Sequence, residues 1–438
     1  DWFVGDDMHH NGAFSVLMSF NFFKQFGKPR PEPLTKYPPA AEYPSPDAYN
    51  FFLAHTPLKK LNEEILKNEI PFWDTMLAHG IYDNYWKSRS NLQYMKNIKP
   101  ALLLVGGLYD AEDMYGPLHI YKAIEKNDQP NNTRIVMGPW THGSWIWASG
   151  DSLGDFSFGS NTADYYRTQI LLPFFKYYLK GEGDLKINDS YVFDTGKNEW
   201  SNYDVWPPKN VSEVKYFFQQ DEKLNQQNPS TESSFSEYIS DPFNPVPYTA
   251  KFQDSKAFYN PVHLIEDQRY VSTRPDVLTF ESHVLSSDIT IAGPIIADLF
   301  VSTTGTDADF VVKVIDVYPD DEDDPDPNPA KVEMGGYERL VRTEIFRGKF
   351  RNSYENPEPF EPNKVTEVKI NLNDAFHTFK TRHKIMIQVS SSYFPFFDVN
   401  PNTFCDIYNA DKDKFVKANI KIYHSKDFSS NVVFKILK

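Results

Sequence analysis

The chain has 438 residues, a formal net charge of −15 and an aromatic content of 16%. This length predicts about two to four domains with cores of their own, and so many aromatic residues exclude a mainly disordered chain. The negative charge, with no Lys/Arg cluster to offset it, argues against nucleic acid or an anionic membrane surface as a partner. No apolar stretch reaches the roughly 18 residues needed to span a bilayer. The single cysteine, Cys405, excludes an internal disulfide and a multi-thiolate metal site.

The first half of the chain mixes helical and α/β patterns. Residues 12–96 combine Phe-rich helical periodicity with a Pro-rich connector, which predicts a helical insertion. Downstream, the apolar run Ala101–Val105, the amphipathic stretch Gly116–Lys126 and the apolar run Thr133–Met137 predict strand, helix and strand. Residues 97–205 are therefore expected to form an α/β domain.

The second half of the chain, residues 206–438, has a β-rich texture. Short β-branched and aromatic runs are separated by Gly, Pro, Asn and Asp, which predicts a β-sandwich or jelly roll. The runs are Val214–Phe218, Ile289–Ile291, Ala297–Val301, Phe310–Ile315, Lys384–Val389, Asn419–Tyr423 and Val432–Ile436. The predicted fold class is α/β plus β.

Charged side chains follow both strands of the predicted βαβ unit. The stretch GGLYDAEDMYG, residues 106–116, brings Asp110, Glu112 and Asp113 directly after the first strand, and GPWTHGSW, residues 138–145, brings His142 after the second. Ligands of open α/β sheets bind at the carboxyl ends of the strands, where an Asp and a His would stand like the last two members of a hydrolase triad. The plainer alternative is that Asp110 caps a helix and His142 is an ordinary loop histidine.

Several long segments resemble one enzyme group. GGLYDAEDMYGPLHIYKAIEK and IVMGPWTHGSW resemble the acid and histidine segments of the α-amino acid ester hydrolases and the related glutaryl-cephalosporin acylases. This group is similar in turn to cocaine esterase and the X-prolyl dipeptidyl peptidases. DWFVGDDMHHNGAF resembles the segment after the nucleophile, and MGGYERLVRTEIFRGKFR with IMIQVSSSYFPFFDVNP resembles the C-terminal jelly roll.

The resemblance implies a fold and a set of roles. The fold would be the C-terminal portion of an α/β-hydrolase sheet, formed by residues 1–11 and 97–205, with a helical cap at 12–96 and a jelly roll at 206–438. Asp110 would be the triad acid and His142 the base. Glu112 and Asp113, joined by Asp7, would grip the α-ammonium group of the substrate, with Asp6 as the alternative third member. The plainer explanation of Glu112 and Asp113 is that acidic residues favour a helix N-terminus.

The chain departs from this pattern in lacking a nucleophile. A serine in a Gly-x-Ser elbow is required upstream of Asp110, and no serine there has such a context. GDSLG, around Ser152, matches the pattern literally but follows both Asp110 and His142, so we interpret it as a decoy. The chain opens on Asp1 without an initiator Met or signal pattern, and we therefore expect it to lack the N-terminal portion of a longer enzyme.

Together with these residues, the resemblance implies a serine hydrolase that cleaves esters or amides of α-amino acyl groups through an acyl-enzyme, without metal or other cofactor. Three enzymatic alternatives remain: a glutaryl-cephalosporin acylase, although three carboxylates would repel a dicarboxylic acyl chain, an X-prolyl dipeptidyl peptidase, or a general esterase. An alternative of another class is a binding protein on a degenerate hydrolase scaffold. Expected partners are a small ester, amide or short peptide and the N-terminal portion of the enzyme. The resemblance also allows a homo-oligomer and slightly favours a periplasmic or secreted location.

Overall fold

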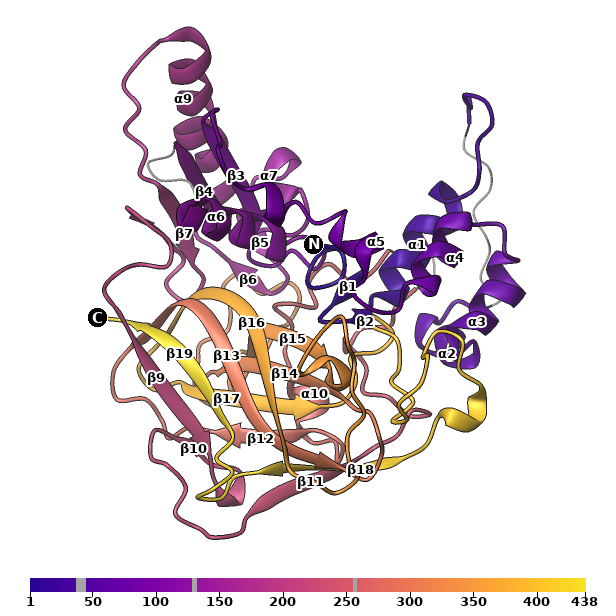
Figure 1. Cartoon of the computed structure of the whole chain (residues 1–438). Coiled ribbons are helices and arrows are strands. Elements are labelled where there is room, and N and C mark those ends of the chain that lie inside the picture. Colours follow the sequence, from indigo (N-terminus) through magenta and orange to yellow (C-terminus); the bar gives the residue numbers. More distant parts are fainter. Residues whose placement is uncertain (37–44, 128–131, 255–257) are drawn as a thin grey trace.

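The computed structural model of the chain describes residues 1–36, 45–127, 132–254 and 258–438. It has a mixed α/β architecture in which a small α/β layer and a group of helices lie above a large β-rich body (Figure 1). No helix among the described residues is long and apolar enough to cross a membrane.

The α/β layer is built on a four-stranded sheet with the order β3-β4-β7-β8. β3 (Leu102–Gly107) and β4 (Thr133–Gly138) run parallel, joined by α6 (Tyr115–Asn127), as the sequence predicts. β7 (Ser190–Asp194) continues the sheet in parallel, and β8 (Glu199–Tyr203) closes it as an antiparallel hairpin partner. Between β4 and β7 lie α7 (Ser144–Trp147), the hairpin β5 (Ser152–Leu153) and β6 (Phe156–Ser157), and consecutive helical turns over residues 162–180.

The helices of the N-terminal segment pack on the β-rich body. Residues 12–96 contain the end of a short hairpin, β1 (His9–His10) with β2 (Ala13–Phe14), followed by α1 (Val16–Phe26), α2 (Ala48–Ala54), α3 (Leu58–Leu61), a π-helical turn (Asn62–Leu66), α4 (Pro71–Ala78), α5 (Asn84–Lys87) and a 3-10 turn (Leu92–Tyr94). Phe14, Phe20 and Trp73 belong to the same apolar core as the strands of the second half. Burial of these large side chains contributes about 1.5–3 kcal/mol each.

The second half consists mainly of two antiparallel sheets that share this core. The seven-stranded sheet contains β9 (Val211–Phe218), β10 (Leu224–Asn225), β11 (Phe235–Ser240), β13 (Ile289–Thr303), β16 (Thr366–Phe379), β18 (Ala418–Tyr423) and β19 (Asn431–Leu437). The four-stranded sheet contains β12 (Leu278–Glu281), β14 (Asp309–Val317), β15 (Glu338–Arg347) and β17 (Lys384–Ser390), and α10 (Arg269–Ser272) precedes it in the chain. Its jelly-roll topology stays a prediction.

One strand differs from the sequence expectation. The runs Ile289–Ile291 and Ala297–Val301 were expected as separate strands because Gly293 and Pro294 interrupt them, but they form the single strand β13. Its pairing with β19 shifts register between Ile291 and Ile296, and Gly293 has a φ of 134°. A bulge therefore absorbs the Gly-Pro pair without ending the strand.

Candidate active site

The loops after β3 and β4 run side by side at the carboxyl edge of the small sheet. Gly107 pairs with Gly138 at the last register position, and the amide of Tyr109 then donates to the carbonyl of Trp140 at 3.1 Å. A Cβ on Gly107 would stand 2.2 Å from that carbonyl oxygen, so only glycine permits the approach. The two loops thus deliver Asp110 and His142 to one place.

Asp110 and His142 are joined directly. His142 Nδ1 lies 3.3 Å from Asp110 Oδ1 and 3.2 Å from Oδ2. Asp110 is buried, and its Oδ1 also accepts the backbone N–H groups of Glu112 (2.9 Å) and Asp113 (3.1 Å). Asp110 therefore caps the turn, as the plainer explanation expects, and holds the imidazole as well. With Nδ1 engaged, Nε2 is the nitrogen left for proton transfer.

Asp113 contacts the same ring, and Glu112 and Asp7 lie near enough to interact electrostatically with His142. Asp113 Oδ2 lies 3.6 Å from His142 Nδ1. The amide of Asp7 donates to the carbonyl of Glu112 at 2.9 Å, which ties the N-terminal segment to this loop. Asp7 has a φ of 51°, a left-handed conformation that is uncommon for a non-glycine residue. The structure therefore brings together all five predicted site residues.

Asp6 and Asp7 have different surroundings. Asp6 is buried, and its Oδ1 accepts the backbone N–H of Gly116 at 2.7 Å in the first turn of α6. Asp7 is only half-buried. Because the carboxylate of Asp6 is engaged by the helix start, Asp7 is the better placed of the two to meet a ligand.

Crowded negative charge shifts the titration of this group. Burial, followed by the charges of Asp7 and Asp110, raises the pKa of Asp113 to about 8. The hydrogen bond that His142 donates to Asp110, together with the charges of Asp110, Glu112 and Asp113, raises the pKa of His142 to about 9. Burial also raises the pKa values of Glu112 and Asp7. A bound cation would strongly stabilise the ionised forms of these three carboxylates.

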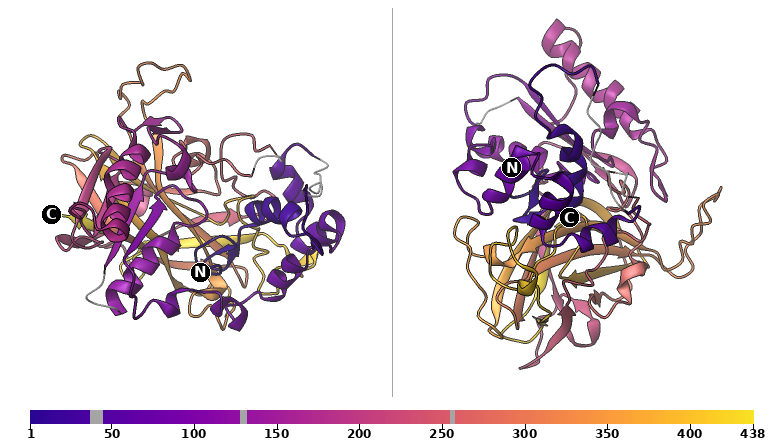
Figure 2. Two further views of the ribbon diagram at one scale, coloured as in Figure 1. Left: turned by 90° about the horizontal axis from the view of Figure 1, so that it is seen from above. Right: turned by 90° about the vertical axis from the view of Figure 1, so that its right-hand side faces the viewer.

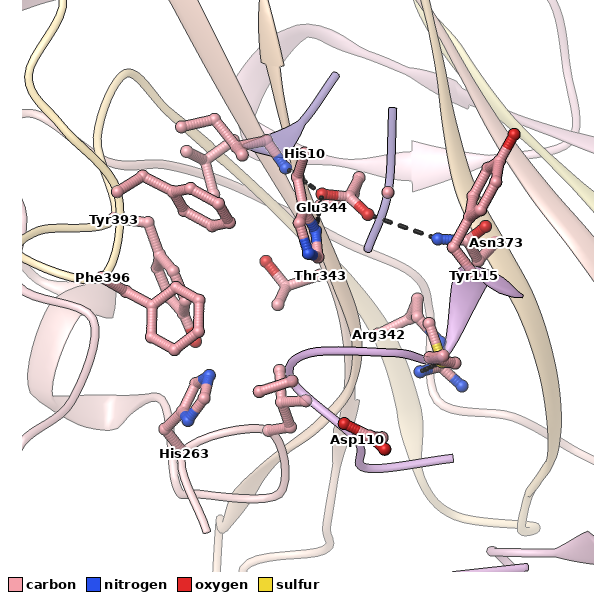
Figure 3. Close-up of a pocket in the computed structure, with 17 residues that line it drawn as sticks. His10, Asp110, Tyr115, His263, Arg342, Thr343, Glu344, Asn373, Tyr393 and Phe396 are labelled. Atoms are coloured by element: carbon pink, nitrogen blue, oxygen red, sulfur yellow. Dashed lines mark hydrogen bonds and ion pairs between the residues drawn. The ribbon is translucent and has the colours of Figure 1, made fainter. Parts of the chain in front are cut away.

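A small cavity lies behind Asp110, between its loop and the β-rich body (Figure 3). Its volume of about 30 Å³ leaves room for about two water molecules rather than an acyl group. The walls include His10, Glu344, His263, Tyr393 and Phe396, and His142 does not line it. The cavity therefore lies on the side of Asp110 away from the ring of His142.

Ser152, the serine of the GDSLG stretch, and the adjacent His9 and His10 lie outside the group around His142. Ser152 is exposed on the β5–β6 hairpin, which is not the strand-to-helix turn that a nucleophile elbow requires. His9 and His10 contact different partners, Tyr408 Oη at 2.9 Å and Glu344 Oε1 at 3.0 Å. In the described part of the chain, no group of three His, Cys, Asp or Glu side chains is arranged to hold a metal ion.

Tyr259 contacts this group of residues but was not predicted from the sequence. Tyr259 Oη donates to Glu112 Oε1 at 2.6 Å, from a loop of the β-rich half. The two residues are 147 positions apart. No motif or spacing marks a lone tyrosine in a polar loop, so only the tertiary fold could reveal this contact.

The face of the small sheet next to the site is incomplete within the described residues. β3 forms an edge of the sheet, and its apolar residues 102–105 are only partly buried. Ile146 and Trp147 on α7 are 70% and 74% exposed, and Leu179 on the projecting helical turns of residues 162–180 is 76% exposed (Figures 1 and 2). The ring of His142 hydrogen-bonds no serine hydroxyl among these residues; its recorded partners are Asp110 and Asp113.

Family models match most of the chain. The model described as "X-Pro dipeptidyl-peptidase (S15 family)" matches residues 7–144, which include Asp110 and His142. The model described as "X-Pro dipeptidyl-peptidase C-terminal non-catalytic domain" matches residues 177–433, more than half of the chain.

The chain is also similar to individual hydrolases over most or all of its length. An aminopeptidase from a marine sediment Thaumarchaeota archaeon superposes with a TM-score of 0.92 at 32% identity, and an α-amino acid ester hydrolase with a TM-score of 0.90 at 32% identity. Each comparison covers 100% of this chain and 71% of the other. The cocaine esterase of Rhodococcus sp. strain MB1 Bresler is 28% identical over 87% of this chain. The match spans 64% of that esterase.

Proposed function

This chain belongs to the superfamily of the X-Pro dipeptidyl peptidases and cocaine esterase, and we propose that it carries the acid, the base and the amine-recognition site of a serine hydrolase for α-amino acyl esters or amides. The observation that most strongly supports this proposal is the contact between Asp110 and His142 beside three further carboxylates. Each feature alone has a structural explanation. Their convergence on one imidazole supports catalysis.

In this proposal His142 is the general base. Asp110 accepts a hydrogen bond from Nδ1–H and fixes the tautomer, so that Nε2 takes the proton from a serine hydroxyl as the oxygen attacks the acyl carbon. The same nitrogen then returns the proton to the leaving alcohol or amine as the acyl-enzyme forms. A water molecule, activated in the same way by His142, then attacks the acyl-enzyme and releases the carboxylic acid product and the free serine.

Asp7, Glu112 and Asp113 would bind the α-ammonium group of the substrate. Hydrogen bonds from an ammonium to carboxylates are stronger than neutral ones, and an acyl group without the amine would leave buried carboxylates unpaired. The cation would have a second effect, because its charge opposes protonation of His142. Binding of the substrate would thereby convert an imidazolium of raised pKa into the neutral base that catalysis needs.

The nucleophile would come from a segment outside these 438 residues, the expected N-terminal portion of the same enzyme. The unpaired edge of β3 and the exposed apolar residues of α7 support this, since such surfaces are normally covered. That segment would complete an α/β-hydrolase sheet formed here by residues 1–11 and 97–205. Residues 12–96 would serve as its cap and residues 206–438 as a jelly-roll domain.

A peptidase is the second candidate. The aminopeptidase and the α-amino acid ester hydrolase that superpose on the chain both act, by name, on substrates with an α-amino group. An ammonium site formed by Asp7, Glu112 and Asp113 would suit either leaving group. A glutaryl substrate remains disfavoured, because its free carboxylate would be repelled by this cluster.

Labelling with a serine-reactive fluorophosphonate tests the proposal. The enzyme is purified from its native source with its intact mass measured, then labelled and digested, and the modified peptide is sequenced. The expected result is a labelled Gly-x-Ser peptide from outside residues 1–438, with labelling lost on His142→Ala. Labelling at Ser152, or no labelling of an enzyme that still hydrolyses esters, would contradict the proposal. Absence of both labelling and hydrolysis would favour a binding protein.

A further inference from the structure

Within the described residues, the side chain of Glu112 has one hydrogen bond. Its donor belongs to the β-rich half of the chain. Tyr259 Oη donates to Glu112 Oε1 at 2.6 Å, and no partner is recorded for Oε2. Tyr259 falls inside residues 177–433, the region whose family model is described as non-catalytic. A residue of that region therefore touches the proposed recognition site directly.

Tyr259 is held firmly from behind. Its ring packs on Phe396 with 5.7 Å between centroids and on His263 with 6.0 Å, the latter edge-on at 89°. The amide of the next residue, Asn260, donates to Tyr248 Oη at 3.0 Å. Phe396 and His263 also form walls of the cavity behind Asp110 (Figure 3). The hydroxyl is thus presented to Glu112 from a fixed aromatic frame.

The bond has a definite chemical consequence for Glu112. A donor on Oε1 fixes the rotation of the carboxylate and leaves Oε2 free to accept from a cation. The hydrogen bond from Tyr259 and the charge of His142 both favour the ionised form of Glu112. Burial and the charges of Asp110 and Asp7 oppose it. Burial and the nearby carboxylates raise the pKa of Tyr259, so the phenol remains a neutral donor.

A purely structural tyrosine–carboxylate bond is the alternative, and the chain contains one for comparison. Tyr337 Oη donates to Asp155 Oδ2 at 2.9 Å, and Tyr337 is buried. The two bonds share their chemistry. They differ in that the partner of Tyr259 belongs to the carboxylate group at His142.

We propose that Tyr259 is a positioning residue for amine recognition, which orients the carboxylate of Glu112 so that Oε2 accepts a hydrogen bond from the α-ammonium group of the substrate. The inference rests on the proposed function, because it presupposes an α-amino acyl substrate. It assigns a part in substrate selection to the β-rich half.

The test compares Tyr259→Phe with the matched control Tyr337→Phe in the complete active enzyme. Substrates are phenylglycine methyl ester and phenylacetic acid methyl ester, which differ only in the amine. Tyr259→Phe is expected to raise KM for the amino ester about five- to tenfold, with kcat and both constants for the des-amino ester within about twofold of wild type. Tyr337→Phe is expected to change neither substrate.

Two further measurements separate positioning from a general structural role. The rise of KM for the amino ester on acidification should begin at higher pH in Tyr259→Phe, because Glu112 loses the donor that favours its ionised form. The double variant Tyr259→Phe/Glu112→Gln should be no worse than Glu112→Gln alone, since Tyr259 acts through Glu112. If Tyr259→Phe folds poorly, Glu112→Asp, which withdraws the carboxylate by one methylene, should give the same selective loss.

The outcomes distinguish the two claims. A wild-type enzyme that does not prefer the amino ester would refute the proposed function and with it this inference. A wild-type enzyme with that preference, unchanged in Tyr259→Phe or lost equally for both esters, would overturn the role of Tyr259 alone. Additive losses in the double variant would also contradict it.

Discussion

Nδ1 of His142 faces two carboxylates, Asp110 Oδ2 at 3.2 Å and Asp113 Oδ2 at 3.6 Å. The buried Asp110 is fixed by two backbone N–H groups, whereas Asp113 belongs to the group that also contains Asp7 and Glu112. One imidazole therefore reports on the proposed triad acid and on the charge of the proposed recognition site. This coupling makes the chemistry of the site accessible to measurement.

Asp110→Asn should reduce kcat of the complete enzyme by about 10³–10⁴-fold with little change in KM. Asparagine keeps an oxygen for the amides of Glu112 and Asp113 but no longer stabilises the imidazolium. Steady-state kinetics and thermal unfolding are the measurements, with the exposed Asp184→Asn as control. A kcat within tenfold of wild type, in a variant of unchanged Tm, would remove Asp110 from the triad.

Binding of a primary ammonium ion should release protons near pH 7.5. With pKa values of about 9 for His142 and about 8 for Asp113, both groups hold protons at that pH in the free protein. An added positive charge disfavours the imidazolium and favours the carboxylate, so both pKa values fall and protons leave. Calorimetry with benzylammonium in buffers of different ionisation enthalpy measures the number released. Proton uptake, or equal heats with neutral benzyl alcohol, would show that no cation binds here.

Glu112→Gln and Asp113→Asn should each raise KM for an amino ester by at least about tenfold without impairing the hydrolysis of a des-amino ester. Asp113→Asn should in addition lower the pKa of His142, because a neighbouring negative charge is removed. Kinetics with both esters and an NMR titration of the histidine ring provide the two readouts. Parallel losses for both esters would indicate damage to the fold instead of lost recognition.

Ser152→Ala should retain the activity of wild type within about twofold. Ser152 is exposed on a two-stranded hairpin and has no recorded contact with His142. Ester hydrolysis by the purified variant is the measurement. Complete loss of activity with an intact fold would make this serine the nucleophile.

Arg347→Met should destabilise the protein by about 3–5 kcal/mol. Arg347 is buried between Asp309 at 3.0 Å and Asp398 at 2.7 Å, and its removal leaves two carboxylates without their cation. Urea unfolding followed by circular dichroism is the measurement. The exposed pair of Arg382 and Asp321 provides the control, where Arg382→Met should cost about 1 kcal/mol or less. Equal effects of the two substitutions would contradict the assigned role of burial.

Local patterns were sufficient for the central βαβ unit. The apolar runs Ala101–Val105 and Thr133–Met137 are long enough for buried strands, and parallel pairing then brings the residues after them to one edge. The meeting of Asp110 and His142 follows from this geometry. Their chemical roles came from family resemblance, since an aspartate and a histidine at a sheet edge also occur in ordinary loops.

Contacts between distant segments were beyond the sequence. Nothing in the order of residues shows that Tyr259 reaches Glu112, or that Asp6 binds the start of α6 while Asp7 stays half-buried. The continuity of β13 was missed for a related reason. A Gly-Pro pair usually interrupts a strand, and only the pairing of β13 with β16 and β19 shows that a bulge opposite β19 accommodates Gly293 and Pro294.

The selectivity of the complete enzyme for an α-amino group tests the central claim most directly. The measurement is kcat/KM for phenylglycine methyl ester and for phenylacetic acid methyl ester, at a pH where the amine is protonated. The account predicts a ratio of at least about 100 in favour of the amino ester, with most of it lost in Asp113→Asn. A ratio near one, or a preference for the ester without an amine, would contradict the assignment of Asp7, Glu112 and Asp113 as an ammonium site.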